Sequence, residues 1–254
     1  MKSFLRFALF LFSAAAAVWL IAHQPAAIAQ PAVETGFAAT RDPALDVKVR
    51  YQTVTIDYPG FGYSDAPSTN DFAYTFDHLA DIIEKFTRRV GVEKYSIYMQ
   101  DFGGPVGLRL ATRAPQQVTS LIIQNANAYE EGLPDVFWTP ARTLWKDPST
   151  ANYDPLRDAA LSDGELEWNY THGVKNSEAI NPDSWVLQRA LLNRPGNKDA
   201  MLALLYDYRT NLGRYSEWHE YFREHQPPTL RSPGAIPLGV GMRKRPSDGR
   251  TTGT

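Results

Sequence analysis

The stretch YSIYMQDFGGPVGLRL, residues 95–110, holds one carboxylate in a position where chemistry is possible. An apolar run at 95–99 predicts a short buried strand, and a helix is expected over 103–112. Asp101 lies in the turn between them, just before Gly103 and Gly104. Two roles suit an aspartate in this turn: it caps the helix N-terminus, or it is a nucleophile held on a tight strand-to-helix turn.

The elements that would position Asp101 alternate between strand and helix. Apolar and polar residues roughly alternate over 45–56, which predicts a strand. Residues 77–90 have the period of an amphipathic helix, and an apolar run at 121–123 predicts a strand after the 103–112 helix. Strand, helix, strand, helix, strand is typical of a parallel sheet with crossover helices, so the fold class is α/β.

Strand signals vanish after residue 128, which predicts a partial core over 30–128 followed by a helical cap over 129–212. Many aromatic residues fall in this cap, among them Tyr170 and Tyr208. A helix at 215–225 is expected to return the chain to the core, within a segment over 213–230. The helices predicted within the cap span 135–145, 164–171, 183–192 and 198–211.

Two motifs together resemble those of one family. QDFGGPVG resembles the nucleophile elbow of the α/β-hydrolases, with Asp101 where most members have serine. DYPGFGYSD, residues 57–65, resembles the D-x-P-G-x-G-x-S loop of the same family. With an aspartate at the elbow, residues 51–230 resemble the haloalkane dehalogenase and epoxide hydrolase branch. The resemblance implies an α/β-hydrolase-type parallel sheet with a helical cap.

The same resemblance implies a reaction. Aspartate ionises at about pH 4, so Asp101 is expected to be an anion at neutral pH without a base to activate it. It would displace a halide or open an epoxide and form an alkyl ester, which water activated by a histidine–acid pair would hydrolyse. The backbone N–H of Phe102 would be one oxyanion donor in that hydrolysis, and the helix dipole would favour the anion.

The substrate expected from this resemblance is a small apolar organic molecule such as an epoxide or a haloalkane, with no cofactor. Many dehalogenases have a tryptophan after the nucleophile, but this chain has Phe102, which has no ring N–H for a halide. Epoxide hydrolases use cap tyrosines to protonate the epoxide oxygen. YDYRTN, residues 206–211, resembles the segment that carries one of them, which makes Tyr208 a candidate and Tyr170 a possible second. Both could instead be packing aromatics.

Several family features are missing, so the sheet is expected to be incomplete at both ends. No H-G-x-P motif precedes the elbow, and the strand predicted at 45–56 looks like the first strand joined to the fourth. The missing third strand would leave its neighbours unpaired. No histidine follows His225, and Asp248 is the only later acid. His219 and His225 are expected to be exposed rather than to replace the missing base.

The two ends of the chain carry their own predictions. Lys2 and Arg6 precede an apolar run, and an A-x-A site ends at Ala29, which predicts a signal peptide over 1–29 and a periplasmic or secreted protein. After cleavage no membrane contact is expected; an uncleaved anchor is the alternative. The tail, residues 231–254, is rich in Gly and Pro and predicts disorder or a shifted reading frame.

Composition limits the function classes. A formal net charge of −2 gives nucleic acid no basic surface to bind, the chain has no cysteine for a disulfide, and no metal-binding motif appears. Three interpretations remain open. The chain is a hydrolase whose sequence is interrupted, or a degenerate relative that binds an apolar small molecule or a partner without catalysis, or a product that does not fold stably. The oligomeric state is not set by the sequence.

Overall fold

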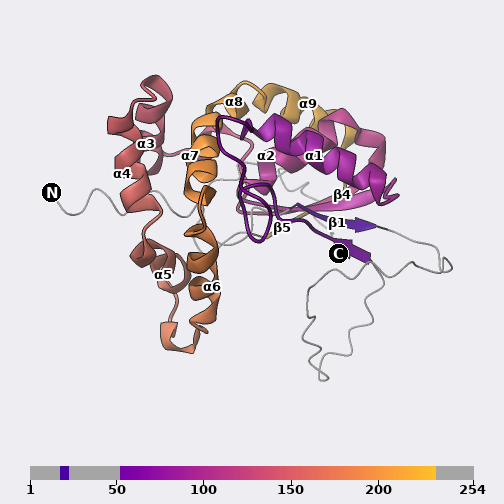
Figure 1. Ribbon diagram of the computed structural model, residues 1–254. Helices are drawn as coiled ribbons and strands as arrows, with labels where there is room; N and C mark the ends of the chain where they lie inside the picture. The colour runs from indigo at the N-terminus through magenta and orange to yellow at the C-terminus, as the bar shows by residue number, and fades with distance from the viewer. Residues whose placement is uncertain (1–17, 23–51, 233–254) are drawn as a thin grey trace, which may run out of the picture.

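The computed structural model describes residues 18–22 and 52–232 (Figure 1). Its centre is a five-stranded sheet in the order β2-β1-β3-β4-β5. The strands are β1 (Val18–Ala22), β2 (Gln52–Val54), β3 (Tyr95–Gln100), β4 (Val118–Gln124) and β5 (Thr229–Ser232).

Strands β3, β4 and β5 form the predicted parallel part of the sheet. Ile97 pairs with Leu121, and Leu121 pairs in turn with Thr229. The tail prediction is corrected at its start, because residues 231–232 belong to β5 and pair with β4. The rest of the predicted tail, 233–254, lies outside the described residues.

The expectation of unpaired neighbours on the other side of β3 was wrong. Strand β1 lies between β2 and β3 and runs antiparallel to both, with Leu20 opposite Val54 on one side and Ile97 on the other. Only residues 52–54 of the strand predicted at 45–56 are strand among the described residues. The sheet is therefore mixed rather than parallel throughout, and its antiparallel strand comes from the segment predicted to be a leader.

Helices α1 (Phe76–Arg89), α2 (Gly103–Arg113) and α9 (Tyr215–His225) lie together over one face of the sheet (Figure 1). Helix α1 begins where predicted because Thr75 caps it: its hydroxyl oxygen accepts the His78 N–H at 3.1 Å. Asp77 in the first turn and Arg88 and Arg89 in the last turn suit the helix dipole.

The cap is helical, and four of its helices, α3 to α6, stand beside the sheet rather than over it (Figure 1). The helix predicted at 198–211 is two helices that meet at Tyr208, and α4 was not predicted. No described helix is long and apolar enough to cross a membrane. The cap helices are α3 (Asp135–Lys146), α4 (Thr150–Ala160), α5 (Asp163–Thr171), α6 (Asp183–Leu192), α7 (Asn197–Asp207) and α8 (Arg209–Leu212). Short 3-10 turns lie at Pro115–Gln117, Glu130–Gly132 and Ser177–Ala179.

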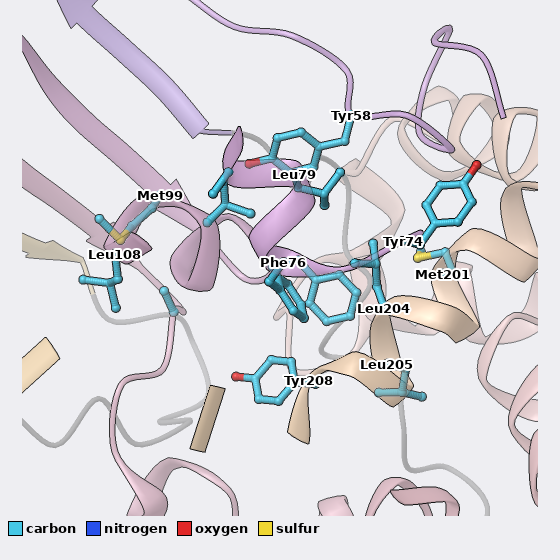
Figure 2. Close-up of a cluster of buried hydrophobic side chains, with 14 of the residues drawn as sticks. Tyr58, Tyr74, Phe76, Leu79, Met99, Leu108, Met201, Leu204, Leu205 and Tyr208 are labelled. Carbon is cyan, nitrogen blue, oxygen red and sulfur yellow. The ribbon is translucent and has the colours of Figure 1, made fainter. Parts of the chain in front are cut away.

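One buried cluster joins the cap to the core (Figure 2). Phe76 and Leu79 of α1 are fully buried, and Leu204 and Leu205 bring the apolar side of α7 into the same cluster. Burial of such side chains stabilises the fold by about 1.5–3 kcal/mol each. The cluster also contains Tyr208, at the end of α7, so the core sets where this tyrosine lies.

Candidate active site

Asp101 occupies a strained turn between β3 and α2. Its φ is 50°, in the left-handed region that non-glycine residues seldom adopt. Its carbonyl oxygen accepts the Gly104 N–H at 2.9 Å, which closes the turn as α2 begins. Such strain persists only where the surrounding structure imposes it, and it is typical of functional sites.

Gly104 allows this turn to exist. A Cβ at this position would lie 2.6 Å from the Cβ of Ala126, in the segment after β4, so any side chain would push the helix from the sheet. The turn therefore requires glycine at position 104, and the cause is the close approach of α2 to the segment after β4.

Asp101 is not the cap of α2. The N-cap residue is Phe102, and no side chain accepts a capping hydrogen bond at this helix end. Of the two roles that suited an aspartate in this turn, capping is therefore excluded by the geometry, while a buried carboxylate on a strained turn remains.

The surroundings of Asp101 disfavour the ionised form of its carboxyl group. Asp101 is 8% exposed, and burial raises the pKa of its carboxyl well above the usual range. The Phe102 N–H donates a hydrogen bond to this carboxyl and lowers the pKa again in part. The expectation that Asp101 ionises without help therefore needs correction: the anion needs hydrogen-bond donors or a nearby positive charge.

Tyr208 lies near the elbow in an aromatic enclosure, with its ring centroid 6.0 Å from that of Phe102. Burial raises the pKa of its phenol well above the usual range, and the neighbouring Tyr215 and Asp101 raise it further. The Tyr208 ring centroid lies 5.7 Å from that of Phe76, and Trp138 is 4.7 Å away. Figure 2 shows the Tyr208 ring below Phe76, at the end of α7. The structure thus brings the first predicted cap tyrosine to the elbow.

Two further polar side chains complete this group. The Asn127 Nδ2 donates to the Tyr215 hydroxyl oxygen at 3.0 Å. A hydrogen bond from the Tyr208 hydroxyl to Tyr215 raises the pKa of Tyr208 and lowers the pKa of Tyr215. Asn127 also forms a hydrogen bond with Tyr208 that lowers its pKa. Asn127, Tyr208 and Tyr215 together form a polar cluster. No local pattern in the sequence points to Asn127 or Tyr215, because Asn127 meets Tyr215 only through folding, across 88 positions.

Tyr170, the second predicted cap tyrosine, lies elsewhere. Its hydroxyl donates to the Oε1 of Gln188 at 2.8 Å, and its ring lies 6.0 Å from that of Trp185. Both partners belong to α6, so the hydrogen bond and ring contact of Tyr170 stay within the outer part of the cap. The structure does not bring Tyr170 to Asp101.

The 57–65 loop is folded tightly and is held by the cap. The Asp57 Oδ2 accepts the Tyr63 N–H at 2.9 Å. A Cβ at Gly62, whose φ is +51°, would lie 2.2 Å from this oxygen, so the motif needs glycine there. Arg194, between α6 and α7, donates to the carbonyl oxygens of Gly62 and Ser64.

The two candidate substitute bases lie in different surroundings. His225 is exposed, as expected. His219 is half-buried instead: its ring stacks on Tyr129 at 4.1 Å, and its Nε2 lies 2.8 Å from the Ala128 carbonyl oxygen. His219 is thus one turn from Tyr215, but nothing in the described geometry joins it to Asp101. Among the described residues no cluster could hold a metal ion.

Comparison with known proteins identifies the fold family. The model of the alpha/beta hydrolase fold family matches residues 36–167, which is half of the chain. A hydrolase of Saccharomyces cerevisiae, itself uncharacterized, is 33% identical over 191 residues, which are 73% of this chain and 64% of the yeast protein. Epoxide hydrolase 3 of Xenopus tropicalis is 37% identical over 76 residues, 30% of this chain and 20% of that protein.

Solved structures agree on the fold. A mutant of a haloalkane dehalogenase from Agrobacterium tumefaciens superposes with a TM-score of 0.55 at 16% identity, over 71% of this chain and 62% of the dehalogenase. The chain spans less than two thirds of the length of each of these relatives. The chain belongs to the α/β-hydrolase family, and haloalkane dehalogenases and epoxide hydrolases are among the members that it resembles.

Proposed function

We propose that Asp101 attacks a carbon atom of a small apolar epoxide, or less readily of a haloalkane, and forms an alkyl-enzyme ester. The observation that carries this proposal is a buried carboxylate on a strained turn, with the Tyr208 ring packed against the next residue, Phe102. The surrounding aromatic side chains suit an apolar substrate. Phe102 has no ring N–H to hold a halide, which favours the epoxide.

The proposed step balances in atoms and charge. A carboxylate oxygen of Asp101 forms a bond to one epoxide carbon while the bond from that carbon to the epoxide oxygen breaks. The oxygen takes the phenolic proton of Tyr208, so that a hydroxyalkyl ester and a phenolate result. Solvent later returns a proton to Tyr208. General acid help of this kind contributes typically about 10²–10⁴-fold to such a step.

We propose further that the ester persists. Hydrolysis requires a base that activates water, and no histidine in residues 52–232 contacts Asp101. His78 stacks on Phe72, and His172 stacks on Trp168, both away from the elbow. His219 is turned to the Ala128 carbonyl oxygen.

The test is the covalent mass of the protein after incubation with 1,2-epoxyhexane. We expect a single adduct with the mass of the epoxide, located on Asp101 by peptide fragmentation. Asp101→Asn should give none. An unmodified wild-type protein that also releases no diol would contradict the nucleophilic role. Release of the diol over many turnovers would uphold that role but contradict the persistence of the ester.

One observation favours a second candidate, namely binding without reaction. Burial raises the pKa of Asp101, and a protonated carboxyl is a poor nucleophile. A neutral Asp101 would instead donate a hydrogen bond to an apolar ligand with an oxygen atom. In this case the epoxide would bind, as measured by calorimetry, but leave the protein mass unchanged.

The proposed export signal and strand β1 exclude one another in one mature chain. Cleavage after Ala29 would remove Val18–Ala22, and β3 would lose its antiparallel neighbour. N-terminal sequencing of protein expressed from the whole gene separates the two. A start at Gln30 supports export to the periplasm or medium, and retention of residues 18–22 supports the mixed sheet.

A further inference from the structure

Two contacts at Phe76 join the end of the cap helix α7 to the start of the core helix α1 (Figure 2). The Asp207 Oδ2 accepts the Phe76 N–H at 2.8 Å, across 131 positions of the chain. The next residue, Tyr208, packs its ring against that of Phe76, edge to face, with 5.7 Å between the centroids. Asp207 and Phe76 are both buried, so water does not compete for this hydrogen bond.

Phe76 also lies against the elbow. Its ring is edge to face with that of Phe102, with 5.3 Å between the centroids, and Phe102 follows Asp101 directly. On another side, the Arg109 guanidinium lies 5.6 Å from the centroid of the Phe76 ring. Phe76 therefore belongs to the core side of the contact, with α1 and α2, whereas Asp207 and Tyr208 belong to the cap side.

Asp207 is a buried acid that the proposed reaction does not use. Burial raises the pKa of its carboxyl, and the hydrogen bond from the Phe76 N–H is the largest of the effects that lower it again. Helix α1 already has a local cap, because the Thr75 hydroxyl accepts the His78 N–H. The bond from Phe76 to Asp207 thus adds something that a local cap cannot: it ties the residue before Tyr208 to the core.

We propose that Asp207 is a positioning residue for Tyr208. Its acceptor oxygen holds the end of α7 against Phe76, so that the Tyr208 phenol meets the oxygen of an epoxide that opens at Asp101. This inference rests on the proposed function and deepens it, because it assigns a role to a side chain outside the elbow, the loop and the cap tyrosines. The competing explanation is that Asp207 only satisfies the first N–H of α1.

Two probes of equal chain length separate these explanations. Opening of 1,2-epoxyhexane leaves an alkoxide that needs a proton, whereas 1-bromohexane loses bromide, which needs none. Alkylation of Asp101 is followed by intact mass and by consumption of each probe. Asp207→Ala should slow the reaction of the epoxide about tenfold and leave that of the bromide within about twofold, because the elbow stays with α2 while the end of α7 loses its attachment.

Asp207→Asn is the conservative variant. Its amide oxygen can accept the same Phe76 N–H, so both probes should react within about twofold of the wild type. An epoxide rate as low as that of Asp207→Ala would overturn the inference, because the acceptor would then not be what matters. Equal slowing of both probes by Asp207→Ala, or slowing of neither, would also overturn it.

Asn197→Ala is the matched control for a loosened cap. Asn197 lies at the other end of α7 and is 2% exposed, and its Nδ2 donates to the Leu191 carbonyl oxygen at 2.8 Å, within the cap. This variant loses a buried hydrogen bond from the same helix but keeps the bond between Asp207 and Phe76. Both probes should react with it within about twofold of the wild type. A selective loss of the epoxide reaction equal to that of Asp207→Ala would overturn the positioning role.

A second measurement keeps the inference testable if the wild type gives neither adduct nor diol, or if Asp207→Ala does not fold. The first outcome would defeat the proposed function but leave the attachment of Tyr208 to be measured. In the wild type, the Phe76 amide should exchange slowly with solvent, because it is buried and bonded to Asp207. Exchange as fast as that of an exposed amide would overturn the inference without any alkylation.

The position of the Tyr208 ring can be followed in the same way. In protein labelled with ¹³C in the tyrosine rings, the Tyr208 signal should shift in Asp207→Ala, since the ring would move relative to Phe76. It should stay in place in Asp207→Asn and in Asn197→Ala. A Tyr208 signal unchanged in Asp207→Ala would overturn the inference, whatever the outcome with the two probes.

Discussion

The inner and the outer parts of the cap are fastened differently. The inner cap segment, residues 207–211, is bound to the core by buried polar groups. The Asp207 Oδ2 accepts the Phe76 N–H at 2.8 Å, at the start of α1. The Asn211 Oδ1 accepts from the Arg109 Nη1 at 2.7 Å, on α2. Tyr208 lies between these two attachments and is therefore fixed relative to Asp101.

The outer cap, helices α5 and α6, has a hydrogen bond and an ion pair between its own two helices. Tyr170 donates to Gln188, and Arg189 pairs with Asp163 at 3.5 Å across the same two helices. Both members of that ion pair are about a third or more exposed, so the pair contributes little. The two cap tyrosines therefore differ. Tyr208 is flanked by hydrogen bonds from the inner cap segment to the core, whereas the hydrogen bond of Tyr170 goes to Gln188 of α6.

The largest expected effect on stability comes from replacing Arg109, which joins α2 to the inner cap segment through Asn211. Arg109 is fully buried and donates to Asp77 at 3.0 Å, to Asn211 and to the Pro105 carbonyl oxygen. We expect Arg109→Met to lower the free energy of unfolding by about 3 kcal/mol, since several polar groups lose their partner. Arg189→Met in the outer cap should cost less than about 0.5 kcal/mol. Urea unfolding of both variants checks this, and equal losses would remove the distinction.

A smaller loss of stability is expected when Asn211, the partner of Arg109 in the inner cap segment, is replaced. Asn211 is fully buried, and Asn211→Ala leaves one Arg109 N–H without its acceptor. The free energy of unfolding should fall by about 1–2 kcal/mol. Gln188→Ala, which removes the acceptor of Tyr170 in the outer cap, is the control and should cost about 0.5 kcal/mol. If Gln188→Ala costs more, the outer cap is fastened more firmly than its contacts indicate.

The smallest effect has the opposite sign. The folded-state pKa of Asp101 is raised above the unfolded value, so the folded protein binds more protons between the two, and its stability falls as pH rises through this window. Asp101→Asn escapes this loss and should gain about 1 kcal/mol at neutral pH, with the gain vanishing at acid pH. Asp163→Asn, at an exposed outer-cap carboxylate, is the control. Thermal unfolding at several pH values measures the difference, and a gain independent of pH would contradict the burial argument.

Features with a local cause could be predicted from the sequence. The elbow is one, because a strand, a carboxylate and two glycines lie within ten residues. Helices α1, α2 and α9 are others, because their periods are local, and α1 also has a local cap in Thr75. Strand β1 could not be predicted as sheet, since its apolar run equally suits a leader, and only its pairing with β3 distinguishes the two.

Features with a distant cause could not be predicted. Arg109 and Asn211 are 102 positions apart, and nothing local in either segment indicates that they meet. Asn127 and Tyr215 are 88 positions apart, and both look like ordinary polar or packing residues. Tyr208 was a candidate only through the resemblance of its segment, whereas Tyr170 was a candidate by residue type. The structure distinguishes the two tyrosines, because hydrogen bonds to the core flank Tyr208, while Tyr170 is bonded to Gln188 in the outer cap.

The central claim is that the elbow and the inner cap segment form one site, and that the outer cap is not part of it. Its most direct test is the rate at which 1,2-epoxyhexane alkylates Asp101 in Tyr208→Phe and in Tyr170→Phe. The account predicts a loss of about 10²-fold or more in the first variant and a rate within about twofold of the wild type in the second. Equal rates in the two variants, or a larger loss in Tyr170→Phe, would contradict it.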